Sequence, residues 1–231
     1  MKSGQVPTRP YYQKSDKMDT SIASAIVVDQ SGSMSGLLKD TIKGMIALTD
    51  ALTKIGAAVQ VSGYRDGGRW NHEARQEVNH SYHQSSGTRY HRTDYITNDV
   101  FMDFGEKFGQ VKHRFASLRA SGGTPTADGM QFGLDALNNR EEGHRIMFVI
   151  TDGCPYSNHV PVIKHQCRIA AEAGIHIIGV GIGEGTEFVS DLFPDSVYCP
   201  DLADLPVKLI SKLKGVLDPS TKKRGRKVKN S

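Results

Sequence analysis

The strongest constraint on the fold is the alternation of short apolar runs with longer segments of helical spacing. Residues 22–29 (Ile-Ala-Ser-Ala-Ile-Val-Val-Asp) and 145–152 (Arg-Ile-Met-Phe-Val-Ile-Thr-Asp) are apolar runs rich in β-branched residues, as is typical of strands buried on both faces. Between and after these runs, apolar residues recur at helical spacing. Strands that alternate with helices predict a doubly wound α/β domain, with helices on both faces of a mostly parallel sheet.

The same patterns predict the order of the elements. Gly56 and Gly174 are expected to end helices as C-caps. The predicted strands cover residues 22–29, 57–64, 145–152, 175–181 and 196–199, and the predicted helices cover residues 37–55, 103–118, 126–138, 160–173 and 201–217. The alternating residues 88–96 are expected to form an antiparallel edge strand.

The 231 residues fit one domain, which is expected at residues 21–217. Residues 1–20 read as an irregular lead-in, and residues 65–94 as a polar insertion too long for an ordinary loop. Residues 218–231 contain six Lys or Arg and one Asp, a net charge of +5, whereas the whole chain carries only +4. The rest of the chain is therefore close to neutral, and the basic character belongs to a tail that we expect to be disordered.

Oxygen-bearing side chains follow the ends of the predicted strands. Asp29, Ser31 and Ser33 follow the first strand, Asp152 follows the strand 145–152, and Thr124 lies on a glycine turn just before a helix. In parallel sheets ligands bind beyond the carboxyl ends of the strands, so these groups are expected to converge. All are hard oxygen donors, which favours Mg²⁺, with Mn²⁺ or Ca²⁺ as alternatives, over zinc.

Together these turns resemble the metal-ion-dependent adhesion site of von Willebrand factor A-type domains. The resemblance rests on Asp29-x-Ser31-x-Ser33, Gly-Gly-Thr124 and Thr-Asp152-Gly, in this order. It implies a Rossmann-like fold in which these five residues bind one cation directly or through water. It also implies an open coordination position that accepts a Glu or Asp of a partner protein. The chain is therefore expected to be a protein-binding module and not an enzyme.

Two stretches are similar, within that family, to the A-type domain of the large subunit of aerobic cobaltochelatase and to related bacterial or phage proteins. They are Gly-Gly-Thr-Pro-Thr-Ala at 122–127, and residues 145–155 followed by Ile-Ile-Gly-Val-Gly-Ile-Gly at 177–183. In cobaltochelatase this domain works with a AAA+ ATPase that remodels a target complex. The resemblance implies a AAA+ ATPase, or the client of one, as partner. A subunit of a cobaltochelatase-like enzyme complex is the alternative.

Simpler explanations exist for single parts of the pattern. The turn at Asp29 would by itself cap the following helix, because Ser and Asp satisfy free N–H groups there. Asp152 would by itself suit a phosphoryl-transfer nucleophile, but no Lys closes a strand where such a site needs one. Cys154 is expected to be a small buried residue, one of three reduced cysteines that form neither a disulfide framework nor a zinc pattern.

The two polar segments carry the remaining hypotheses. The insertion contains four irregularly spaced histidines, which favours a solvated loop over a second metal site: His72, His80, His83 and His91. The tail contains Lys-Lys-Arg-Gly-Arg-Lys-Val-Lys at 222–229, similar to a minor-groove AT-hook core but without the following Pro. Weak nucleic-acid binding and a solubilising role both stay open for this tail.

Location follows from what the sequence lacks. No apolar stretch approaches the roughly 20 residues of a membrane-spanning helix. Residues 1–20 also lack the apolar stretch of a secretory signal. A cytoplasmic location with no membrane contact is therefore expected.

Overall fold

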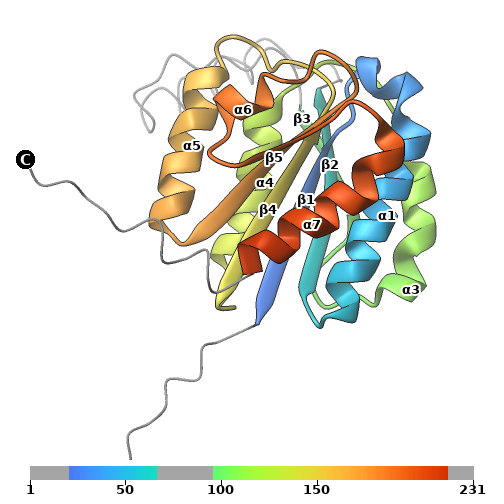
Figure 1. The fold of residues 1–231 in the computed structure, drawn as a ribbon, viewed down its shortest axis with the longest axis vertical. Coiled ribbons are helices and arrows are strands. Elements are labelled where there is room, and N and C mark those ends of the chain that lie inside the picture. The colour runs from blue at the N-terminus through green and yellow to red at the C-terminus, as the bar shows by residue number, and fades with distance from the viewer. Residues whose placement is uncertain (1–20, 67–95, 218–231) are drawn as a thin grey trace, which may run out of the picture.

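The computed structural model describes residues 21–66 and 96–217. They form a central sheet with helices packed around it (Figure 1). Six strands run in the order β3-β2-β1-β4-β5-β6. Their bounds are β1 Ile22–Asp29, β2 Ala58–Asp66, β3 Ile96–Met102, β4 His144–Thr151, β5 Ile175–Ile182 and β6 Ser196–Cys199. Every neighbouring pair is parallel except β2 and β3, which are antiparallel. The predicted doubly wound, mostly parallel α/β fold is confirmed.

Helices cover both faces of this sheet (Figure 1). One face is packed by α1 (Leu38–Lys54), α3 (Phe108–Val111) and α7 (Leu205–Leu217). The other is packed by α4 (Thr126–Asn138), α5 (Val160–Glu172) and α6 (Val189–Leu192). Three 3₁₀ segments complete the described secondary structure: η1 Gly32–Gly36, η2 Lys112–Ser117 and η3 Leu202–Asp204. None of the described helices has the length and apolar character needed to cross a membrane.

Two hydrophobic cores explain why the central strands read as continuous apolar runs. Side chains alternate between the faces of a strand. In β1, Ile26 and Val28 therefore enter the core beneath α1 and α7, while Ala25 and Val27 enter the core beneath α4. Every residue of β1 is buried. Only the end of such a strand can present polar groups to solvent.

The path of the chain places a topological switch point between β1 and β4. From β1 the chain crosses one face through α1 and joins β2, which lies on one side of β1. β4 pairs with β1 on the other side and is reached through α4 on the opposite face. Strand order therefore changes direction between β1 and β4. In open α/β sheets ligands bind at this switch point, beyond the carboxyl ends of the strands.

The structure corrects several predicted boundaries. The edge strand is Ile96–Met102, so only its first residue lies within the predicted 88–96. Asn98 and Asp99 at its centre are poor strand formers, and pairing with β2 places them in the sheet. The predicted helix 103–118 is only α3 followed by η2, because a turn with Gly105 at φ 85° precedes it. The short helix α6 was not predicted.

Several predictions fall outside the described residues. These are the lead-in 1–20, most of the polar insertion with its four histidines, and the basic tail 218–231. The insertion was expected to begin at Arg65, but Arg65 and Asp66 are the last two residues of β2. This correction matters because Asp66 contributes to the site described next.

Candidate metal centre

Asp29, the last residue of β1, lies at the base of the site. It is fully buried, and both of its carboxylate oxygens accept hydrogen bonds. The backbone N–H of Ser31 lies 2.7 Å from Oδ1, and the Thr151 hydroxyl lies 2.8 Å from Oδ2. Burial raises the pKa of Asp29 to about 6, although these hydrogen bonds lower it in part. An anionic carboxylate at this depth is costly without a nearby positive charge.

Two serine hydroxyls continue from this carboxylate toward solvent. Ser31 is buried and also hydrogen-bonds Asp29 through its side chain. Its Oγ lies 3.0 Å from the Oγ of Ser33, which is exposed. The two x positions of the motif are Gln30, which is buried, and Gly32, which has no side chain. The Asp-x-Ser-x-Ser motif therefore places three oxygen-bearing side chains on one side of the turn.

Asp152 closes this row of oxygens from the neighbouring strand. It follows the last residue of β4, and its Oδ1 accepts a hydrogen bond from Ser33 Oγ at 2.9 Å. Half-burial raises the pKa of Asp152, while the bond from Ser33 lowers it in part. Asp29, Ser31, Ser33 and Asp152 thus form one continuous chain of contacts across the carboxyl ends of β1 and β4.

The loop of Thr124 lies against the same turn. Gly32 N–H donates to Gly122 O at 3.0 Å, and Ser121 N–H donates to Gln30 O at 2.7 Å. Thr124 itself is half-buried, and its hydroxyl makes no hydrogen bond to another described residue. The structure therefore brings four of the five predicted residues into direct contact and places the loop of the fifth beside them.

Two residues of β2 belong to the surroundings of the site and were not predicted. Asp66 accepts hydrogen bonds from Gly123 N–H and from the Tyr156 hydroxyl. Tyr64 is fully buried, and its hydroxyl lies 3.2 Å from Thr126 Oγ1. The sequence signal for Asp66 was present, as a carboxylate ending an apolar strand. It was missed because Arg65 and Asp66 were assigned to the insertion.

The oxygen set fits a small divalent cation. Mg²⁺ prefers octahedral oxygen ligands at 2.0–2.1 Å, which places neighbouring ligand oxygens about 3 Å apart. The oxygens of Ser31 and Ser33 are separated by 3.0 Å, and those of Ser33 and Asp152 by 2.9 Å. Among the described residues no three His, Cys, Asp or Glu side chains gather as a metal cluster. The candidate centre instead combines two carboxylates with neutral hydroxyls, a set of hard oxygen donors.

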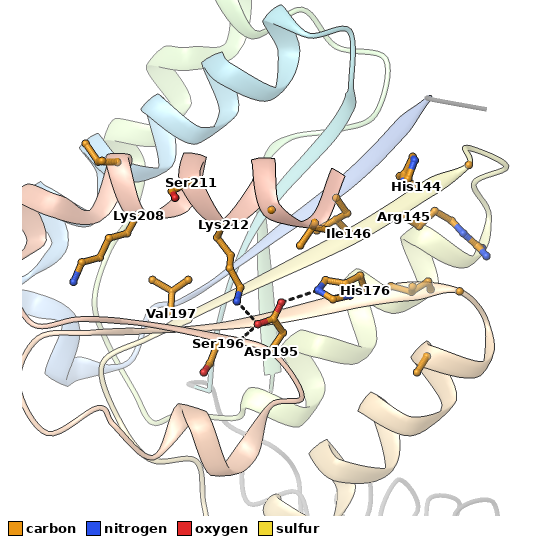
Figure 2. Close-up of a pocket in the computed structure, with 17 residues that line it drawn as sticks. His144, Arg145, Ile146, His176, Asp195, Ser196, Val197, Lys208, Ser211 and Lys212 are labelled. Atoms are coloured by element: carbon orange, nitrogen blue, oxygen red, sulfur yellow. Dashed lines mark hydrogen bonds and ion pairs between the residues drawn. The ribbon is translucent and has the colours of Figure 1, made fainter. Parts of the chain in front are cut away.

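Two other features, the cysteines and a large pocket, lie outside the row of oxygens. Cys154 was expected to be buried but is exposed, and all three cysteines are free. A pocket of about 1180 Å³ lies at the opposite end of the strands, between α7 and the starts of β4, β5 and β6 (Figure 2). The candidate centre thus lies away from this pocket, at the carboxyl ends of β1 and β4.

Comparison with known proteins agrees with this geometry. The family model of the von Willebrand factor type A domain matches residues 25–189, which include all five predicted ligands. The chain belongs to the von Willebrand factor type A (VWA) family. VWA domains usually serve as protein-interaction or adhesion modules. No curated protein matched the chain.

Solved structures with the VWA fold are similar in shape but distant in sequence. The pilus adhesin SpaC of Lactobacillus rhamnosus GG has a TM-score of 0.60 at 16% identity, over 85% of this chain and 30% of that one. A von Willebrand factor type A protein of Catenulispora acidiphila has the same score and identity, over 85% and 43% of the two chains. The mussel byssus protein PTMP1 has a TM-score of 0.58 at 14% identity, over 87% and 47%, and that structure has zinc in its metal-ion-dependent adhesion site. This chain thus spans less than half the length of these neighbours.

Proposed function

We propose that this VWA domain is a protein-binding module that depends on a divalent cation, with Mg²⁺ preferred. Asp29, Ser31, Ser33, Thr124 and Asp152 would hold the cation, directly or through water. The observation that carries the proposal is the continuous row of oxygens from Asp29 to Asp152, spaced as the neighbouring ligands of an octahedral ion would be.

Each residue has a separate role in this proposal. Asp29 and Asp152 supply the negative charge, from the buried base and the half-buried side of the site. Ser31, Ser33 and Thr124 are neutral, and five side chains leave at least one of the six positions of an octahedral cation to an outside ligand. Once bound, the cation would accept one more anionic oxygen from outside. Ser33 is exposed, so the open side faces solvent, where the Asp or Glu of a partner can approach.

The proposed partner is a AAA+ ATPase or the client of such an ATPase. The support is the similarity of residues 122–127 and 145–155 to the corresponding turns of the cobaltochelatase A-type domain. A non-catalytic subunit of a chelatase-like complex is the related alternative, and both agree with a cytoplasmic protein. The two are distinguished by an assay of a purified candidate ATPase with its metal-insertion substrate. Chelatase turnover that requires this chain supports the alternative, whereas binding and ATP hydrolysis without turnover support the module.

The basic tail supports a second candidate function, weak binding of nucleic acid. Its six Lys or Arg within fourteen residues contrast with a nearly neutral domain. Phosphate contacts of this kind require charge alone. This function is independent of the metal centre and is tested separately below.

The direct test is a pull-down from the native host with Mg²⁺ or with EDTA. Wild-type protein should recover partners only with Mg²⁺. Asp152→Ala and Ser33→Ala should lose them, and Thr124→Ala should weaken recovery, since water can replace its hydroxyl. The matched control is Asp50→Ala, which removes an exposed carboxylate that pairs with Lys54 on α1. Equal recovery by folded Asp152→Ala and wild type would show that any bound metal is structural and that the mechanism is wrong.

A further inference from the structure

Strand β2 supplies none of the five proposed ligands. Two side chains near its end nevertheless contact the loop that carries Thr124. Tyr64 and Asp66 are two residues apart and therefore lie on the same face of the sheet. We propose that Tyr64 and Asp66 are positioning residues that hold Thr124 at the metal centre from both sides. This inference rests on the proposed function, because it assigns the groups that set the geometry of that same site.

Asp66 holds the chain immediately before Thr124. Its carboxylate is 5% exposed, and both oxygens are used by the protein itself. Oδ1 accepts from Gly123 N–H, and Oδ2 accepts from the Tyr156 hydroxyl at 2.8 Å. Asp66 thus joins the Thr124 loop to the segment that follows Asp152. Because its two oxygens are occupied and buried, Asp66 acts through these loops and is not itself a ligand.

The glycines before Thr124 show how close this contact is. Gly122 has φ 76°, a conformation that favours glycine, and a Cβ there would overlap the backbone of Asp66. A Cβ on Gly123 would overlap the Tyr156 hydroxyl. The two glycines are therefore required by the approach of β2 and of the Tyr156 segment, in addition to the turn itself.

Tyr64 holds the chain immediately after Thr124. Its hydroxyl donates to Thr126 Oγ1, in the first residue of α4, at 3.2 Å. Thr151, whose hydroxyl donates to Asp29 Oδ2 at 2.8 Å, lies beside the same phenol. The ring is fixed by packing, since a Cβ on Gly129 would overlap it. One buried phenol thus connects the Thr124 loop with the base of the site.

Such fixing matters because the threonine hydroxyl is short and Mg²⁺ tolerates little distortion. Mg²⁺ requires near-ideal ligand geometry at 2.0–2.1 Å, so a loop shift of about 1 Å removes a hydroxyl from the ligand set. Loss of groups that orient metal ligands typically weakens metal affinity about 10–100-fold. Tyr64→Phe and Asp66→Asn remove one hydrogen bond each, so each should weaken affinity by roughly tenfold, the lower end of that range.

The experiment is a double-mutant cycle on the full chain, with Mn²⁺ as the probe and calorimetry as the readout. Tyr64→Phe and Asp66→Asn are each measured alone and in a Thr124→Ala background. Tyr198→Phe is the matched control, because its hydroxyl contacts Glu187 and not the proposed ligand loops. Melting of every variant in EDTA reports metal-free stability, which separates positioning from general destabilisation.

The expected result is a roughly tenfold loss of Mn²⁺ affinity in each single variant, and almost no further loss once Thr124 is Ala. Tyr198→Phe should bind like wild type. Equal affinity of Tyr64→Phe and wild type, or losses that add fully to that of Thr124→Ala, would overturn the positioning role alone. Failure of the wild type to bind Mn²⁺ would overturn the proposed function and this inference with it. If Asp66→Asn does not fold, Tyr64→Phe decides, since it removes one oxygen and keeps the ring.

Discussion

At the scale of the residue, the metal centre should be visible through Asp29, the most deeply buried of its oxygen donors. A cation that binds only the folded state stabilises it by mass action, by about 2.7 kcal/mol at a concentration 100 times Kd. For a domain of this size, that corresponds to a rise in Tm of roughly 5–11 °C. We expect such a rise for wild-type protein in Mg²⁺ relative to EDTA, and none for Asp29→Ala.

Differential scanning fluorimetry measures this effect, with Asp50→Ala as a control that should retain the full rise. Mn²⁺, Ca²⁺ and Zn²⁺ at matched concentrations rank the preference among metals. The zinc arm is informative because PTMP1 has zinc at its corresponding motif. Equal Tm of the wild type in all four metals and in EDTA would rule out the site.

At the scale of the element, α7 is tied to the sheet by a group far from the metal centre. Asp195 pairs with Lys212 of α7, and its Oδ2 lies 2.9 Å from His176 Nε2 at the start of β5 (Figure 2). Partial burial raises the pKa of Asp195, but the hydrogen bonds from Lys212 and His176 lower it by more, to below its ordinary 3.8. A lowered folded-state pKa means that the carboxylate stabilises the fold above the unfolded-state pKa. That contribution is lost as pH falls through the folded-state value.

We therefore expect Asp195→Asn to lower the free energy of unfolding by about 1 kcal/mol at pH 7, and by less near pH 3. Urea denaturation in EDTA at both pH values measures the difference without any metal contribution. Asp50→Asn, which weakens a more exposed pair on α1, should show a smaller loss at pH 7. An Asp195→Asn loss of the same size at both pH values would mean that packing, and not the carboxylate charge, is responsible.

At the scale of the whole molecule, charge is divided between a nearly neutral domain and a tail of net charge +5. Deletion of residues 219–231 should abolish any DNA mobility shift at low salt, while the Tm rise with Mg²⁺ is unchanged. Because at most six cations meet phosphates, full-length affinity should fall by up to about 10³-fold between 50 and 200 mM salt. DNA binding that survives the deletion would assign the tail a solubilising role.

The sequence could predict the fold class, and which side chains gather beyond the strand ends, because both depend on local patterns. A strand buried on both faces must be apolar along its length, so 22–29 and 145–152 were recognisable without any partner strand. Parallel strands bring their carboxyl ends to one edge, so Asp29 and Asp152 were expected to meet there although they are 123 positions apart. The contact of Ser33 with Asp152 agrees with that expectation.

Only the tertiary structure could decide the roles of β2, β3 and the groups around the ligands. β3 is ordered by its antiparallel pairing with β2, which outweighs the weak strand propensity of Asn98 and Asp99. Asp66 read as part of a polar insertion. Its hydrogen-bond partners, Gly123 and Tyr156, are 57 and 90 positions away, so no local pattern could reveal them. The sequence by itself determined which oxygens are available to a cation, since residue type and spacing are local. The packing of distant loops determined what holds those oxygens in place, since a buried hydrogen bond depends on partners that no local pattern specifies.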